Sequence, residues 1–404
     1  MSCNWPLVKL ADVACIITTK IDANQITKDC YISTENMQPY KGGVSSADSL
    51  PSAAKFNSFR VGDTLFSNIR TYFEKVWLAS FSGGASADVL IFRTKDESVL
   101  LSEYLYHFLS SPEFIEFTVR TSKGAKMPRG DKGAMMDFEF KLPPVEIQKI
   151  IACSLQGLER KVRLNSQTNQ TLEQMAQAIF KSWFVDFDPV KAKINGEQPE
   201  GMDAATASLF PEKLVESELG LIPDGWEAKQ LKDILELAYG KALKKTDRVE
   251  GDVPVYGSGG LTGYHNQNLV EGPGIIVGRK GTVGSVYWEP KAFYPIDTVF
   301  YVKPKAGYSL NYCYLILQNL GLKNMNTDAA VPGLNRNNAY RLEVVTPSQG
   351  VLNKFESLMS AFQSKIDGNN AENSSLETLR DTLLPKLLSG EIELGTSEEL
   401  VEAI

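Results

Sequence analysis

The sequence predicts an α+β protein with two similar α/β units, separated by two long helices that form an antiparallel coiled coil with pseudo-twofold symmetry. Three observations lead to this prediction. Two stretches, 151–183 and 355–387, carry apolar residues at alternating steps of four and three, the heptad spacing of coiled-coil helices. The second stretch repeats the first 204 residues later. Each stretch follows a region of short strand-like segments, so the chain is an internal duplication of unit and helix.

The first heptad stretch has a polar middle. Its apolar seam positions are Ile151, Leu155, Leu158, Val162, Leu172, Ala176, Ile179 and Trp183. The same spacing passes through Asn165 and Asn169 between the two apolar halves. One interpretation is that these asparagines fix the register of the helix pair, as polar seam residues do in coiled coils. The other is a break or an irregular turn in each helix.

The second heptad stretch has its asparagines at the matching places. Its seam positions are Phe355, Met359, Phe362, Ile366, Asn369, Asn373, Leu376, Arg380, Leu383 and Leu387. Arg380 departs from the pattern, because it corresponds to Ala176, and we expect its long stem to lie along the seam. Each helix can bury only a narrow apolar stripe, so we expect each to pair with the other inside the chain.

Proline and tryptophan positions suggest the domain boundaries. Pro143-Pro144 and Pro347 stand before the two heptad stretches, and Trp226 opens the second unit as Trp5 opens the first. The expected division is 1–143 first unit, 144–188 first long helix, 189–222 connector, 223–346 second unit, 347–390 second long helix and 391–404 acidic tail.

Within the units, short segments of β-branched and aromatic residues predict strands. In the first unit we expect strands at 31–33, 60–66, 76–79, 89–92 and 138–142, and a helix over 102–119. In the second unit we expect strands at 272–277, 298–302 and 342–346, a helix over 310–320 and a polar loop over 324–338.

Charge is distributed unevenly along the 404 residues, whose net charge is −7. Residues 1–150 carry 17 Lys and Arg against 17 Asp and Glu, and residues 226–350 carry 14 against 11, whereas 190–225 hold 3 against 7. The acidity therefore lies in the connector and the tail, and the units remain compatible with an anionic partner.

The composition makes several other classes of protein improbable. No run of 18 apolar residues and no signal peptide is present, so we expect a cytoplasmic protein. Five scattered cysteines without a C-x-x-C pair argue against a structural zinc site, and two histidines leave little material for histidine catalysis.

Four junction segments carry a resemblance to a known family. They are 141–151 (KLPPVEIQKII), 180–187 (FKSWFVDF), 220–227 (GLIPDGWE) and 383–391 (LLPKLLSGE). With the duplicated architecture, they resemble the specificity subunits of type I restriction-modification enzymes, over nearly the whole chain. The two units then correspond to target recognition domains.

The resemblance implies a DNA-binding module that has no catalysis or cofactor of its own. In this family, two methyltransferase subunits that bind S-adenosylmethionine dock on the specificity subunit and methylate adenine. Two restriction subunits, which are translocases and nucleases that use ATP and Mg²⁺, complete the complex. Partners implied for this chain are therefore double-stranded DNA and both kinds of subunit.

Cationic, amide and aromatic side chains in equivalent loops of the two units are the candidate DNA contacts. Lysine and arginine bind phosphates, arginine reads guanine, and asparagine can read adenine. In the first unit the candidates are Arg70, Tyr72, Lys123, Lys126, Arg129 and Lys132, from a turn at 67–72 and a loop at 121–133. In the second they are Tyr264, His265, Arg279, Lys280, Asn335 and Arg336.

Duplication also predicts the type of DNA site. A helix of about 37 residues is roughly 55 Å long at about 1.5 Å per residue, long enough to hold two half-sites about one turn of DNA apart. Because the two units differ in sequence, we expect a bipartite, asymmetric site with an unread spacer.

Two other functions are alternatives to DNA recognition. A coiled-coil adaptor that binds only polypeptides would not need cations in both equivalent loops. An autonomous nuclease would use Asp131, Glu139 and Lys141, but such a D…E-x-K pattern arises often by chance. The sequence has no G-x-x-x-x-G-K-[ST] loop and no Asn-Pro-Pro-aromatic motif, so ATP hydrolysis and methyl transfer are expected of partner subunits.

Overall fold

The computed structural model describes residues 5–325 and 333–392, and the chain divides into two compact units. Unit 1 comprises Met1–Leu164 and Glu372–Ile404, and unit 2 comprises Asn165–Ala371. The division passes through both long helices, so each unit contains one α/β domain and half of each helix. The start of the chain, part of the predicted loop 324–338 and most of the predicted acidic tail lie outside the described residues.

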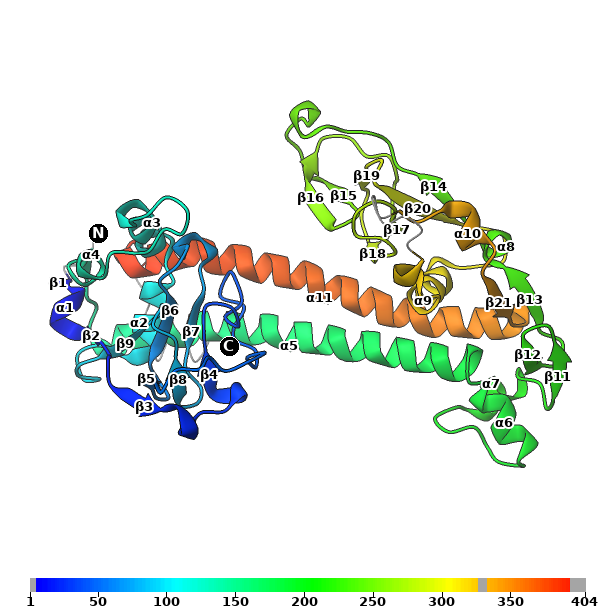
Figure 1. Cartoon of the computed structure of the whole chain (residues 1–404), viewed down its shortest axis with the longest axis horizontal. Helices are drawn as coiled ribbons and strands as arrows, with labels where there is room; N and C mark the ends of the chain where they lie inside the picture. Colours follow the sequence, from blue (N-terminus) through cyan, green and yellow to red (C-terminus); the bar gives the residue numbers. More distant parts are fainter. Residues whose placement is uncertain (1–4, 326–332, 393–404) are drawn as a thin grey trace. The chain divides into compact units, whose positions relative to one another are not determined.

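Two helices, α5 (Val145–Phe184) and α11 (Gln349–Ser389), are the long helices of Figure 1. Within unit 1, Lys161 and Glu372 form an ion pair at 3.1 Å, while Leu155 shares a core with Leu387. The residue numbers of the two helices therefore run in opposite directions, which confirms the predicted antiparallel pair.

The asparagines of the seam lie inside unbroken helices. Asn165 and Asn169 are buried within α5, and Asn369 is buried within α11. Asn169 donates from Nδ2 to Asn370 Oδ1 at 2.8 Å and accepts at Oδ1 from Asn369 Nδ2 at 2.7 Å. The alternative of an irregular turn is therefore wrong.

The seam side chains differ in burial. Ile151, Leu155, Phe355, Met359 and Ile366 are buried. Leu158, Val162, Leu172, Ile179, Phe362, Leu376 and Leu383 are partly exposed. The Arg380 side chain is only 16% exposed and its guanidinium pairs with Asp381, so its stem is covered as expected.

The α/β domain of unit 1 is built on an antiparallel sheet of order β2-β9-β6-β7. Its strands are β2 (Ala14–Ile16), β6 (Thr64–Ser67), β7 (Val76–Leu78) and β9 (Val89–Thr94). A two-stranded sheet joins β1 (Leu7–Lys9) to β10 (Glu139–Lys141). A second sheet of order β3-β5-β8-β4 contains β3 (Lys20–Asp22), β4 (Tyr31–Ile32), β5 (Lys55–Phe59) and β8 (Gly83–Ala85). The shorter helices are α1 (Leu10–Val13), η1 (Ala23–Gln25), η2 (Lys28–Cys30), η3 (Thr71–Phe73), α2 (Ser102–Leu109), α3 (Pro112–Thr121) and α4 (Lys132–Met136).

Unit 2 repeats this order of elements. Its main antiparallel sheet, β14-β20-β17-β18, contains β14 (Leu235–Tyr239), β17 (Gly274–Gly278), β18 (Val286–Glu289) and β20 (Val299–Pro304). The pair of β13 (Glu227–Gln230) and β21 (Glu343–Thr346) matches β1 and β10. The second sheet differs, with order β16-β15-β19, and contains β15 (Val253–Gly257), β16 (Gly260–His265) and β19 (Tyr294–Pro295). The shorter helices of the domain are α8 (Leu231–Ile234), η4 (Lys245–Asp247), α9 (Leu310–Asn319), η5 (Leu322–Asn324) and α10 (Arg336–Tyr340). Thus the duplication is confirmed for the main sheets and helices, and the two domains diverge in their second sheets.

Two local predictions differ from the structure. The predicted helix 102–119 is two helices, since Ser111 caps α3 and Pro112 at its first position cannot continue α2. The predicted strand 60–66 begins only at Thr64, because Arg60–Asp63 form a turn with Gly62 at φ +87°. The predicted connector contains α6 (Asp188–Ile194), α7 (Ala204–Ser208), β11 (Leu214–Ser217) and β12 (Gly220–Pro223).

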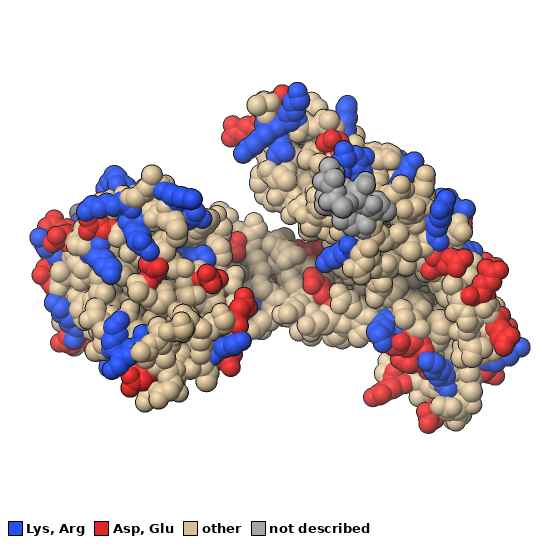
Figure 2. All heavy atoms as spheres, in the orientation of Figure 1, with Lys and Arg blue, Asp and Glu red and all other residues tan. Residues whose placement is uncertain are grey.

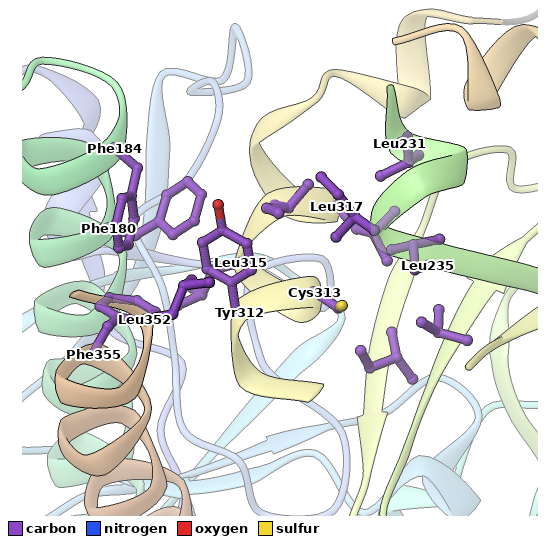
Figure 3. Close-up of a cluster of buried hydrophobic side chains, with 14 of the residues drawn as sticks. Phe180, Phe184, Leu231, Leu235, Tyr312, Cys313, Leu315, Leu317, Leu352 and Phe355 are labelled. Carbon is purple, nitrogen blue, oxygen red and sulfur yellow. The ribbon is translucent and has the colours of Figure 1, made fainter. Parts of the chain in front are cut away.

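In unit 2, α9 lies between the sheet and the helix pair. Figure 3 shows Tyr312 of α9 on the side of Phe180 and Phe355, which belong to α5 and α11, while Cys313 lies on the side of Leu235. All five side chains are buried. The long helices therefore form part of the domain core, and they support the sheet that carries the loops described next.

Candidate nucleic-acid interface

In unit 1, the turn after β6 pairs with the cationic loop 121–133. The Asn68 N–H donates to Asp88 O at 2.8 Å, and the Asn68 carbonyl accepts from Gly130 N–H at 3.1 Å. The Arg70 N–H donates to Pro128 O at 2.9 Å. Two segments about 60 residues apart in sequence are thus held together by main-chain bonds, independently of their side chains.

Unit 2 has the same main-chain arrangement. The Arg279 N–H donates to Thr298 O at 2.9 Å, and the Arg279 carbonyl accepts from Leu334 N–H at 2.8 Å. Lys280 forms an isolated bridge with Gly333, as Ile69 does with Arg129 in unit 1. Arg279 therefore corresponds to Asn68 and Thr298 to Asp88, and the predicted equivalence of the two turns and loops has a structural basis.

Each loop ends in a capped helix of five residues. The Asp131 carboxylate accepts from the N–H groups of Gly133 and Ala134, and the Asn335 side chain does the same for Asn337 and Asn338. Lys132 and Arg336 are the first residues of α4 and α10. The cap fixes the main chain at these two cations.

The unit 1 side chains are exposed, and two of the cations are paired with acids. Arg129 contacts Asp88 Oδ1 at 3.0 Å, with exposed fractions of 54% and 40%. Lys123 pairs with Asp131, and this contact, together with the capping bonds, lowers the pKa of Asp131. Arg70, Tyr72, Lys126 and Lys132 are exposed.

Tyr40 is a residue that the sequence analysis missed. Among the described residues, five that are not glycine have positive φ, and four of them, Tyr40, Lys41, Arg70 and Glu74, lie here. Main-chain bonds from Tyr40 to Phe73 and from Lys41 to Glu74 hold the two loops together. Tyr40 is 67% exposed. Backbone strain that is held in place next to an exposed ring indicates a functional surface.

In unit 2, the predicted cations line a pocket of about 370 Å³. Its lining includes Arg279, Lys280, Asn335 and Arg336. The guanidinium carbons of Arg279 and Arg336 lie over the Tyr239 ring, 5.1 and 4.8 Å from its centre. Tyr239 was not predicted, because β14 is far from both loops in the sequence.

Tyr264 and His265 lie apart from this pocket. Both belong to β16, in the second sheet, and neither lines the pocket. The His265 side chain is buried and its Nδ1 accepts from Val249 N–H at 3.0 Å, and its contact with DNA stays a prediction. Tyr264 is 54% exposed.

The described ranges contain neither a metal site nor a helix suited to a membrane. No group of three or more His, Cys, Asp or Glu side chains there is arranged to hold a metal ion. No helix there is long and apolar enough to span a membrane. Asp131, which the nuclease hypothesis would use, caps α4 and pairs with Lys123.

Figure 2 shows Lys and Arg side chains spread over the visible face of each unit, with Asp and Glu between them. Neither unit presents a surface of one sign on this face. The charge of this face therefore does not by itself indicate an anionic partner.

Known proteins are similar to this chain over most of its length. The family model described as "Type I restriction modification DNA specificity domain" matches residues 3–174 and 223–377. The specificity subunit of the type I restriction enzyme HindI from Haemophilus influenzae is 27% identical, over 96% of this chain and 100% of its own length. The specificity subunit of the type I enzyme MjaIX from Methanocaldococcus jannaschii is 25% identical over 73% of this chain and 70% of its own.

A solved structure shares the fold. The S subunit of a type I restriction-modification system from M. genitalium superposes with a TM-score of 0.58 at 17% identity, and covers 97% of both chains. The family model matches most of both units and both long helices, and the same paired turn and loop occur in each unit. This chain therefore belongs to the family of type I restriction-modification DNA specificity subunits.

Proposed function

We propose that this chain reads a bipartite, asymmetric DNA sequence, one half-site with each unit, and directs adenine methylation and restriction to it. The observation that carries this proposal is the duplicated main-chain scaffold with different side chains. Asn68 corresponds to Arg279, and Ile69 to Lys280. The same main-chain scaffold with different side chains is suited to reading two different base sequences.

In unit 1, exposed side chains protrude from this main-chain scaffold. Tyr72, Met127 and Arg129 are 46%, 51% and 54% exposed, respectively. Reading of bases in the major groove needs side chains that extend from the protein, and an arginine fork suits guanine. Lys126 carries a charge without a comparable fork geometry, so it suits a phosphate.

Family membership supports a proposal for the partners and their cofactors. We propose that two methyltransferase subunits and two restriction subunits assemble on the chain, in the cytoplasm. S-adenosylmethionine, ATP and Mg²⁺ then bind in those subunits, and this chain contributes no catalytic residue. The names of the relatives, which are specificity subunits of restriction enzymes, support this division of labour.

Mapping methylated adenines in a host that carries this chain and its methyltransferase tests the proposal. We expect methylation at one bipartite, non-palindromic sequence. Arg129→Ala should relax specificity at one base of one half-site, whereas Lys126→Ala should weaken binding to all sequences by a similar factor. A single contiguous motif would contradict the two-reader proposal, and unchanged profiles for both variants would place base reading elsewhere in unit 1.

A coiled-coil adaptor that binds only polypeptides makes a different prediction. It would show no DNA binding that weakens as salt rises, with or without the methyltransferase. The autonomous nuclease predicts metal-dependent cleavage by the chain alone, lost in Glu139→Ala. Titrating labelled duplex at several salt concentrations, then incubating it with Mg²⁺, separates all three functions.

A further inference from the structure

We propose that the unit 2 pocket between Arg279, Lys280 and Arg336 binds a phosphate group of the DNA backbone, and that unit 1 has no equivalent site. This inference rests on the proposed function, since it takes DNA as the ligand. It goes further by assigning one chemical group of the DNA to one place in one unit.

The charges of the pocket favour an anion. Three cations line it, and none of them forms an ion pair with a carboxylate of the described residues. Arg336 Nε is buried and has no hydrogen-bond partner within the part of the chain that the structure describes. A buried donor without a partner is unfavourable, and an oxygen ligand would recover part of that cost.

Aromatic rings rather than acids hold the two guanidinium groups. Arg279 lies over Tyr239 and Phe300, at 5.1 and 5.8 Å, and Arg336 lies over Tyr239 and Tyr340, at 4.8 and 5.7 Å. A ring fixes the plane of a guanidinium but leaves its charge and its N–H donors available. The pocket is therefore prepared for a ligand with several acceptor oxygens.

The shape of the site favours phosphate over a base. Base edges lie at the floor of a major groove about 8.5 Å deep, and they are read by protruding side chains. A concave site instead receives a group that protrudes from the duplex, and phosphates are the groups on its outside. The pocket of about 370 Å³ is concave, whereas Arg129 and Tyr72 in unit 1 are exposed.

The two units differ in charge at several equivalent positions, since Asn68 and Ile69 of unit 1 stand where unit 2 has Arg279 and Lys280. Asp88 of unit 1 neutralises Arg129, and its structural counterpart in unit 2 is Thr298. The place that a carboxylate occupies in unit 1 therefore has no charge in unit 2. Introducing an acid at position 298 should therefore lower the positive charge at the pocket and weaken its binding of an anion.

The test uses the full chain, with its methyltransferase subunits where binding requires them, and a labelled duplex titrated at rising NaCl. The variants are Arg279→Gln/Arg336→Gln and, separately, Thr298→Asp. Each should weaken binding about tenfold or more and reduce the slope of log K against log salt by about 1, as expected for one lost phosphate contact. Lys303→Ala is the matched control, because Lys303 also lies over a ring, Tyr301, at 5.5 Å but does not line the pocket.

Duplexes with one neutral methylphosphonate linkage identify the phosphate. One position should weaken binding of the wild type while leaving the Arg279→Gln/Arg336→Gln variant unaffected. Unchanged slopes in variants that retain the wild-type circular dichroism overturn the inference, and so does a relaxed base preference at one position, which would indicate base reading. In both cases wild-type binding persists, and the proposed function stands. Absence of wild-type binding at low salt would overturn both.

Discussion

The asparagines in the seam of the long helices predict a measurable coupling energy. Asn169 uses both ends of its side-chain amide, accepting from Asn369 and donating to Asn370. Asn369 is 2% exposed, whereas Asn370 is exposed to water. Replacing Asn169 with leucine leaves the buried Asn369 amide without this acceptor, so we expect a loss of about 1–3 kcal/mol in the stability of unit 2.

The double variant Asn169→Leu/Asn369→Leu removes both partners and puts apolar side chains in the seam. Its stability should lie close to that of the wild type, because no buried amide is left unpaired. Asn369→Leu leaves the buried Asn169 Oδ1 without its donor, so its loss should also be about 1–3 kcal/mol. The coupling energy of the cycle is the sum of the two single losses when the double variant loses nothing, and should therefore be about 2–6 kcal/mol. If the asparagines fix the register, the double variant should nevertheless lose a unique helix pairing, as coiled coils do without their polar seam residue.

Urea unfolding of the four proteins, followed by far-ultraviolet circular dichroism, measures the stabilities. Hydrogen exchange along α5 and α11 shows whether a change is local to the helices. Spin labels at the exposed positions Met175 and Ser364, both within unit 2, report the register as one distance or several. Met175→Leu is the control for a leucine on α5. A coupling energy near zero, or a single sharp distance in the double variant, would refute the reasoning.

Three further predictions address other parts of the chain. Asp88→Asn releases Arg129 from an exposed ion pair worth about 0.2–1 kcal/mol, so it should tighten DNA binding by about twofold to fivefold at low salt in an anisotropy titration; weaker binding would contradict this. Burial lowers the pKa of His107 from 6.5 to about 3, so the unfolded chain binds a proton below pH 6.5 that the native chain does not bind until about pH 3. The contribution of His107 to the free energy of unfolding is therefore complete above pH 6.5 and is lost as the pH falls toward 3. Between pH 7 and 5, the free energy of unfolding of the wild type should fall by about 2 kcal/mol more than that of His107→Gln in urea unfolding; equal losses would show that His107 does not cause this pH dependence. Phe355 is fully buried against four aromatic rings, so Phe355→Ala should destabilise unit 2 by about 3–5 kcal/mol, and a loss below 1 kcal/mol in the same assay would show that this core repacks.

Local patterns explain which parts of the fold could be predicted. Heptad spacing, prolines before each helix and the repeat at 204 residues are properties of neighbouring residues, and they were sufficient for α5, α11 and the duplication. The break before α3 also had a local signal, the Ser111-Pro112 pair, which was overlooked.

The candidate site also has residues that the sequence predicted and residues that it did not. The internal repeat predicted that Arg279 lies in a turn, and Arg336 in a loop, that match a turn and a loop of unit 1. In both units, main-chain hydrogen bonds join the turn to the loop. Tyr239 and Tyr40 had no such signal, since each reaches its surface from a distant strand or loop. The burial of His265 against the Val249 N–H also had no signal in the sequence, because that contact depends on the fold.

The sequence by itself determined the number of units, the helix pair and the family, because periodicity and junction motifs are written in consecutive residues. Only the tertiary structure decided which cations are available to a ligand. Arg129 is held by an acid 41 positions away, whereas Arg279 and Arg336 are held by rings of β14, β20 and α10. Charge neutralisation depends on distance in space, and folding alone sets those distances.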